Sequence, residues 1–232
     1  MTAAPIHIAG ERLLLDPSGV LVWPEQHLLA VADLHLEKGS AAAVRGRLVP
    51  PWDTRVTLER LALALRHWRP RIVVALGDSF HDGDGHARLA AADAARLAAL
   101  TAQARFVWVL GNHDPLPAPG IGGEAAAEFR LGPLRFRHIA EPRTAGEISG
   151  HFHPRATVPT RAATVARPCF VADARRVILP AFGAYTGGLD VRHPEIIRLF
   201  PRGGRVFLLG RERLYSFALA QAMPRAVGAA AD

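Results

Sequence analysis

The strongest constraint on the fold of this chain is a set of three five-residue apolar runs that each stop abruptly at polar residues. The runs are 28–32, followed by Asp33 and His35; 72–76, followed by Asp78; and 106–110, followed by Asn112, His113 and Asp114. Short, continuous apolar runs are typical of strands buried in a parallel sheet. In open α/β sheets, binding sites lie beyond the carboxyl ends of such strands. We therefore expect these polar side chains to converge at one edge of a sheet.

The segments between the runs carry helical patterns. Apolar residues recur at helical spacing between 58 and 68, which predicts a helix that Asp53 or Thr54 caps and Pro70 ends. The Ala-rich segment 86–102 predicts a second helix, whereas 36–51, with two glycines and two prolines, predicts an active-site loop. This alternation of strand and helix favours a parallel sheet with crossover helices, and a hairpin over 12–32 is expected to lead into it.

Beyond residue 127 the pattern changes to short apolar runs separated by turn residues. These runs are 134–139, 164–166, 169–172, 177–179, 196–200 and 206–209. They predict a largely β second half that forms a second sheet of the same domain, because no linker-like segment divides the chain. We therefore expect a single α/β domain over residues 1–215, followed by an Ala-rich tail over 216–232 that is a frayed helix or disordered.

Composition excludes several classes of site. Cys169 is the only cysteine, so neither an intramolecular disulfide nor a cysteine-rich zinc site can form. No apolar stretch approaches the ~20 residues of a membrane-spanning helix. The first eight residues lack the pattern of a secretory signal, so we expect a cytoplasmic protein. The formal net charge of +7 is compatible with nucleic acid as a partner. However, the arginines are scattered, and genome composition explains them equally well.

Three histidines of the second half join the polar residues at the expected strand ends. His138 ends one apolar run, and His151 and His153 stand two apart, a spacing that places both side chains on one side of a strand. The complete candidate set is Asp33, His35, Asp78, Asn112, His138, His151 and His153. Four imidazoles, two carboxylates and one amide oxygen suit two divalent ions such as Mn, Fe, Zn or Co better than Mg or Ca. Each motif alone is common in ordinary turns, and only the ordered combination indicates a site.

Over residues 33–153 the candidate residues stand in five motifs in a fixed order: Asp-x-His, Gly-Asp, Gly-Asn-His-Asp, an isolated histidine and Gly-His-x-His. This ordered set resembles that of the calcineurin-like metallophosphoesterases. Stretches at 34–39, 77–82 and 179–189 are similar to one bacterial subgroup, the ligase-associated DNA damage response endonucleases. The resemblance implies a two-sheet sandwich flanked by helices, in four layers (αββα). It also implies a metal-dependent enzyme that hydrolyses phosphoester bonds.

The resemblance further implies a role for each candidate residue. Asp33, His35 and His153 would hold one metal ion, Asn112, His138 and His151 the other, and Asp78 would bridge both. Manganese is expected first, with zinc, iron or cobalt as alternatives. A hydroxide bridging the two ions would attack phosphorus. His113 would then protonate the departing oxygen, with Asp114 orienting the imidazole.

The identity of the substrate depends mainly on the resemblance. It implies DNA as substrate and partner, a role in DNA repair, and a DNA ligase or helicase as a further partner. His81 and Asp82 follow Asp78 closely and either contact the substrate or make loop hydrogen bonds. A phosphodiesterase or phosphatase acting on a small nucleotide is the alternative within the same fold. A non-catalytic scaffold in a repair complex is the alternative of another class.

Overall fold

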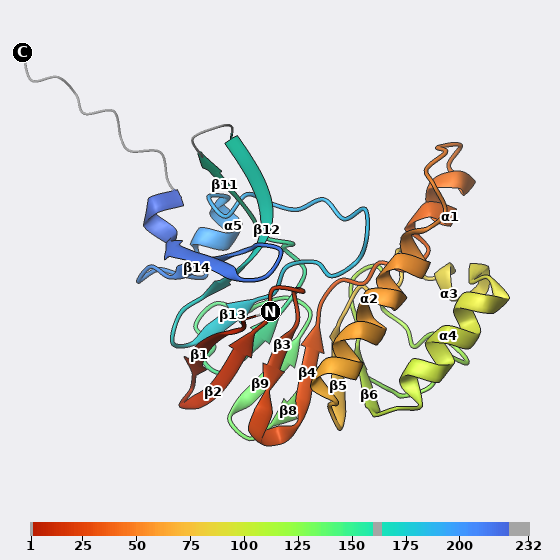
Figure 1. The fold of residues 1–232 in the computed structure, drawn as a ribbon, viewed down its shortest axis with the longest axis horizontal. Helices are drawn as coiled ribbons and strands as arrows, with labels where there is room; N and C mark the ends of the chain where they lie inside the picture. The colour runs from red at the N-terminus through yellow and green to blue at the C-terminus, as the bar shows by residue number, and fades with distance from the viewer. Residues whose placement is uncertain (1, 160–163, 223–232) are drawn as a thin grey trace, which may run out of the picture.

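The computed structural model describes residues 2–159 and 164–222, which form two β-sheets with flanking helices (Figure 1). The first sheet has the strand order β1-β2-β3-β4-β5-β6-β7. Its strands are β1 (Ala4–Ile8), β2 (Glu11–Leu15), β3 (Leu21–Trp23), β4 (Leu28–Val31), β5 (Ile72–Leu76), β6 (Arg105–Val109) and β7 (Glu124–Ala126). Strands β4 to β7 are parallel, which confirms the predicted parallel sheet, whereas β1 to β4 pair antiparallel. The hairpin expected over 12–32 belongs to this antiparallel part.

The second sheet has the order β15-β14-β12-β13-β10-β9-β8, with β11 paired to β12. Its strands are β8 (Phe129–Leu131), β9 (Leu134–Arg137), β10 (Glu147–Ser149), β11 (Arg155–Pro159), β12 (Thr164–Ala172), β13 (Arg176–Ile178), β14 (Arg205–Leu209) and β15 (Leu214–Ala218). Strand β10 is parallel to both β9 and β13, while the other pairs of this sheet are antiparallel. The first sheet is thus built from residues 4–126 and the second from residues 129–218.

Helices flank the two sheets (Figure 1). They are η1 (Pro24–Gln26), α1 (Lys38–Val44), α2 (Asp53–Trp68), α3 (Gly85–Arg88), α4 (Ala91–Thr101), α5 (Pro194–Ile197) and η2 (Leu219–Ala222). One apolar core lies between the first sheet and the helices α2 and α4, a second lies between the two sheets, and a third joins the second sheet to α5 and η2. Four layers result, as expected. Among the described residues, no helix has the length and apolar character needed to cross a membrane.

The predicted loop over 36–51 contains a helix, α1, and the predicted caps of α2 serve this helix instead. The Asp53 carboxylate accepts a hydrogen bond from the Gly39 N–H (3.0 Å), and the Thr54 hydroxyl accepts one from the Glu37 N–H (2.8 Å). Neither side chain caps α2, which begins at Asp53 after the uncapped Trp52. Both residues satisfy backbone donors at the start of α1, because the first N–H groups of a helix have no partner within it.

Two further predictions were wrong in detail. The helix expected over 86–102 is interrupted at Leu89 and Ala90, which are extended. The interruption lets Leu89 pack on the core while Arg88 bonds to the hydroxyl of Ser40. The run 196–200, expected as a strand, overlaps α5, because His193 and Pro194 provide an N-cap and a first helical residue.

The expected C-terminal tail is only partly described. Residues 216–218 belong to β15, so the predicted boundary at residue 215 falls inside a strand of the second sheet. Residues 219–222 form η2, and residues 223–232 lie outside the described part of the chain.

Candidate active site

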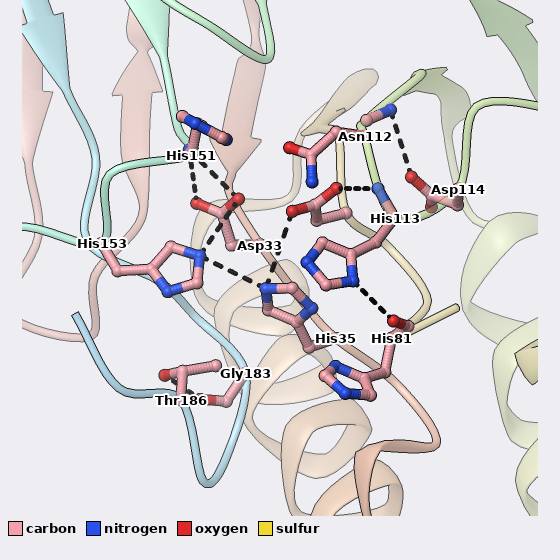
Figure 2. A network of polar contacts seen from close by, with 12 residues as sticks. Asp33, His35, His81, Asn112, His113, Asp114, His151, His153, Gly183 and Thr186 are labelled. Carbon is pink, nitrogen blue, oxygen red and sulfur yellow. Dashed lines mark hydrogen bonds and ion pairs between the residues drawn. The ribbon is translucent and has the colours of Figure 1, made fainter. Parts of the chain in front are cut away.

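All seven side chains predicted as metal ligands lie together where strands of both sheets end. Figure 2 shows five of them, Asp33, His35, Asn112, His151 and His153. Asp33 and His35 follow β4, Asp78 follows β5 and Asn112 follows β6. His138 and His151 follow β9 and β10, which belong to the parallel part of the second sheet. Both sheets therefore direct the carboxyl ends of parallel strands to one place, which is the usual position of a site in such folds.

His151 and His153 reach the site in a way that the strand argument did not predict. Both lie in the loop after β10 rather than in a strand, and both have left-handed backbone, with φ of 70° and 45°. The His151 N–H donates to the Asp33 carboxylate at 3.0 Å. The two imidazoles line the same site, but they enter different ligand groups.

The first ligand group, here the Asp33 group, consists of Asp33, His35, Asp78 and His153. One ligand atom from each lies within 4.8 Å of those of the others. The Nε2 atoms of His35 and His153 are 3.3 Å apart, and His153 Nε2 lies 3.5 Å from Asp33 Oδ1. His35 Nε2 lies 3.8 Å from Asp78 Oδ2.

The second ligand group, here the His138 group, consists of Asp78, Asn112, His138 and His151. His138 Nε2 is at its centre, 3.1 Å from His151 Nδ1, 2.9 Å from Asn112 Oδ1 and 3.4 Å from Asp78 Oδ2. Asp78 is thus the carboxylate that the two groups have in common.

The chemistry of these donors fits two divalent cations. In each group, imidazole nitrogens and carboxylate oxygens face one another, an arrangement that a cation between them stabilises. His138 Nδ1 lies 2.9 Å from the Leu76 carbonyl oxygen. Nδ1 therefore donates its proton there, which leaves the Nε2 lone pair free for a metal ion. The carbonyl has no sequence signal, because any residue at position 76 would supply it.

Burial and hydrogen bonding set the charge of the buried ligands. Asp33 and Asp78 are 0% and 2% exposed, respectively. Burial, with the neighbouring His153, lowers the pKa of His35 to about 3, so this imidazole is neutral at pH 7. Burial raises the pKa of Asp78, but the hydrogen bonds that its carboxylate accepts outweigh burial and bring the pKa to about 2. Neutral imidazole and ionised carboxylate are the forms that bind metals.

Five of the seven ligands have left-handed backbone. Their φ values lie between 43° and 70°, and the residues are Asp33, His35, Asp78, His151 and His153. Such a conformation is uncommon for residues other than glycine, although Asp and His tolerate it better than most, and it costs about 1 kcal/mol or more per residue. The surrounding fold therefore holds these side chains in positions that local preference does not favour.

His113 lies beside both groups, at the exposed rim of the site. Its Nδ1 is 2.7 Å from the His81 carbonyl oxygen, and its ring stacks on that of His81 with centroids 5.3 Å apart (Figure 2). The His113 N–H donates to Asp78 Oδ1 at 2.9 Å. His81 therefore faces the site, and its carbonyl orients the imidazole of His113.

Asp114 does not orient His113, contrary to the sequence-based prediction. Its buried carboxylate accepts hydrogen bonds from the N–H groups of Ser79 (2.7 Å), Phe80 (3.1 Å) and Gly111 (3.1 Å). Burial raises the pKa of Asp114 to about 6, against these donors, which favour the ionised form. Asp114 thus ties the loop after β5 to the loop after β6.

Asp82 makes loop contacts. Its carboxylate accepts hydrogen bonds from Arg88 (2.7 Å) and from the Asp84 N–H (3.2 Å), which favours the loop alternative over substrate contact. Sequence reasoning missed Thr57, whose buried hydroxyl accepts from the Ala184 N–H (3.0 Å) and fixes the turn near His35 and His153. A threonine on the buried face of a helix was the available signal.

One protein family and two solved structures are similar to this chain. The model of the calcineurin-like phosphoesterase family matches residues 27–157, a range that contains all seven ligands. The crystal structure of Pseudomonas putida nuclease MPE is 27% identical, with a TM-score of 0.71, over 92% of this chain and 100% of that chain. YfcE, a phosphoesterase from E. coli, is 14% identical with a TM-score of 0.39, over 83% of this chain and 98% of that chain. No curated protein matches the sequence. Because the family model spans more than half of the chain, the protein belongs to the calcineurin-like phosphoesterase family.

Proposed function

We propose that the protein is an endonuclease that uses two divalent metal ions to hydrolyse phosphodiester bonds in DNA. The observation that carries the proposal is the pair of ligand groups that share Asp78 and adjoin the imidazole of His113. The likeness to nuclease MPE supports nucleic acid as the substrate class. The net charge of +7 is of the sign that attracts a polyanion.

The protein's own residues would divide the chemistry between them. When bound, two divalent ions supply a nucleophilic hydroxide at neutral pH and neutralise negative charge on phosphate oxygens. The Asp33 and His138 groups would hold these ions, with manganese expected first and zinc, iron or cobalt as alternatives. His113 donates a proton from Nε2 to the departing oxygen, while its Nδ1–H donates to the His81 carbonyl.

The biological setting is also part of the proposal. The stretches 34–39, 77–82 and 179–189 are similar to those of the ligase-associated DNA damage response endonucleases. This similarity supports a cytoplasmic role in DNA repair, with a DNA ligase or helicase as a partner.

The test uses purified protein with Mn²⁺ and three substrates. These are a chromogenic phosphodiester, a chromogenic phosphomonoester and closed circular single-stranded DNA. We expect metal-dependent turnover of the diester and linearisation of the circle, because an endonuclease needs no free end. Asp78→Ala removes the shared carboxylate and abolishes both activities. The matched control Asp84→Ala removes an exposed carboxylate of the same loop, outside both ligand groups, and retains both.

Two results would contradict the proposal. Turnover of the chromogenic substrates but never of DNA would contradict the DNA substrate and favour the alternative of a small-nucleotide enzyme. Such an enzyme would also lack the steep salt dependence that DNA binding confers. No turnover of any of the three substrates, with Mn²⁺ or when zinc, iron or cobalt replaces it, would favour a non-catalytic scaffold.

A further inference from the structure

The chain from 38 to 52, here called the arm, carries apolar side chains that nothing covers. It consists of α1 and the loop that connects α1 to α2, and Figure 1 shows it standing clear of both sheets beyond the N-terminal end of α2. All ten residues from 43 to 52 are exposed. Leu48 is 94% exposed and Trp52 64% exposed. Exposed apolar side chains gathered on one segment mark an interaction surface.

The arm is also cationic throughout. It contains Lys38, Arg45 and Arg47 and no acidic residue. Within the described part of the chain, neither Arg45 nor Arg47 forms an ion pair. The arginines are therefore free to meet negative charge from outside the protein.

The arm is fastened next to the active site. It begins three residues after the ligand His35. The Ser40 hydroxyl accepts a hydrogen bond from Arg88 at 3.0 Å, and Arg88 in turn binds Asp82 beside His81. Arg88 thus ties the arm to the loop that carries His81, at the edge of the site.

Nucleic acid is the occupant that this chemistry fits. An unpaired polynucleotide strand offers phosphates to arginines and base faces to an indole, and proteins that bind single strands combine these two contacts. A second copy of the arm would bring like charges together. A protein partner would need a surface on which acidic groups alternate with apolar ones, and no feature of the arm points to such a partner.

We propose that the arm holds an unpaired DNA strand as it enters the active site, with Trp52 stacked on a base and Arg45 and Arg47 on flanking phosphates. This inference rests on the proposed nuclease function and adds the surface that selects the substrate. Lys38, the cation closest along the chain to His35, leads the strand from the arm to the site.

The experiment measures DNA binding and small-substrate turnover on the same variants. The variants are Trp52→Ala, Trp52→Phe and the double change Arg45→Ala/Arg47→Ala, with Arg66→Ala/Arg71→Ala as the charge-matched control at the other end of α2. Binding is followed by fluorescence anisotropy of a labelled 20-nucleotide oligothymidine in EDTA, which prevents cleavage. Hydrolysis of the chromogenic phosphodiester is followed with Mn²⁺. The small diester reports on the metal groups without reaching the arm.

We expect Trp52→Ala to weaken DNA binding about tenfold, and Trp52→Phe to retain it, because a phenyl ring also stacks on bases. The double arginine variant should reduce the slope of log Kd against log salt by about 1.4, since each phosphate contact on a single strand contributes about 0.7. The control should leave that slope unchanged. All variants should hydrolyse the chromogenic diester at the wild-type rate.

The outcomes separate this inference from the proposed function. If wild-type protein cleaves DNA, and Trp52→Ala and the double arginine variant bind it normally, the arm is not the binding surface. An equal loss of slope in the control pair would show only general charge attraction and would also overturn the inference. If wild-type protein hydrolyses the chromogenic diester but neither binds nor cleaves DNA, the proposed function fails and the inference with it.

Discussion

The two ligand groups share Asp78 but differ in charge and burial. The Asp33 group contains two carboxylates, Asp33 and Asp78, both buried. In the His138 group Asp78 is the only carboxylate, and its amide ligand, Asn112, is exposed. Because affinity for a divalent ion rises with the negative charge of its ligands, the Asp33 group should bind its ion more tightly. The comparison predicts that, of two bound ions, one would be held firmly and the other would exchange more readily.

The largest expected effect comes from removing one ligand from each group in turn. Asp33→Ala removes half the negative charge of its group and should lower turnover of the chromogenic diester roughly a thousandfold, since a bound metal contributes several kcal/mol to such reactions. Asn112→Ala removes no charge, and we expect a loss of about a hundredfold that excess Mn²⁺ partly restores. Turnover is measured across a Mn²⁺ titration. Equal losses of turnover in the two variants, with no recovery in excess Mn²⁺, would show that the two ligand groups do not differ in metal affinity.

A general-acid test separates chemistry from metal binding. His113→Ala should slow hydrolysis of a diester with a poor alkyl leaving group by about a hundredfold, because that oxygen needs a proton. With the stable p-nitrophenolate leaving group the rate should change little. Bound manganese, counted by mass spectrometry, should stay at the wild-type level. A uniform loss on both substrates would assign His113 a structural role instead.

Two glycines allow each group to be disturbed without changing a ligand. Gly77 has a φ of +78°, and a Cβ there would collide with the His138 ring. A Cβ on Gly150 would lie 2.7 Å from Asp33 Oδ2 and 2.8 Å from the Ala32 Cβ. Each alanine variant should lower stability by about 1–3 kcal/mol through overpacking. Gly77→Ala should lose the weaker ion only, whereas Gly150→Ala should weaken the tighter one.

Metal counts across a chelator titration, together with circular dichroism, would check this pair of variants. Loss of both ions from both variants, with the fold retained, would show that the groups do not act separately.

The smallest effect, and the one that sharpens the comparison most, is a gain. Asn112→Asp adds a carboxylate to the His138 group and makes the carboxylate counts of the two groups equal. We expect the affinity for the second ion to rise about tenfold, as the added charge attracts the cation directly. Isothermal titration with Mn²⁺ should then show two steps that move closer together. Steps that remain as far apart as in the wild type would mean that charge does not set the order.

The ligands could be predicted from sequence because they stand in short motifs at the ends of recognisable strands. Asp33, Asp78 and Asn112 each follow an apolar run, so their convergence required only the parallel arrangement of the strands. The role of Asp114 could not be predicted in this way. Two of its three donors, Ser79 and Phe80, come from a loop about 35 residues away in the chain, and backbone N–H groups carry no sequence signal.

The helix α1 and the contacts of Asp53 and Thr54 with it could not be predicted from sequence, for a related reason. A seven-residue helix has little stability of its own in water. The start of α1 depends on hydrogen bonds that the Gly39 and Glu37 N–H groups donate to Asp53 and Thr54, which lie 14 and 17 residues further along the chain. The local sequence pattern predicts that these two side chains cap α2, the helix to which they belong. The contacts that satisfy them become visible only when the two helices are placed side by side.

The clean division of the chain between the two sheets has a consequence for assembly. A cut between Ala127 and Glu128 would leave each sheet whole on its own fragment. The N-terminal fragment would carry Asp33, His35, Asp78 and Asn112, and the C-terminal fragment would carry His138, His151 and His153. Each ligand group draws on both fragments, so neither fragment alone would hold a complete group. Enzymatic activity recovered on mixing the fragments would therefore measure how well the two sheets associate. For the same reason, a newly synthesised chain would remain inactive until the second sheet has folded against the first.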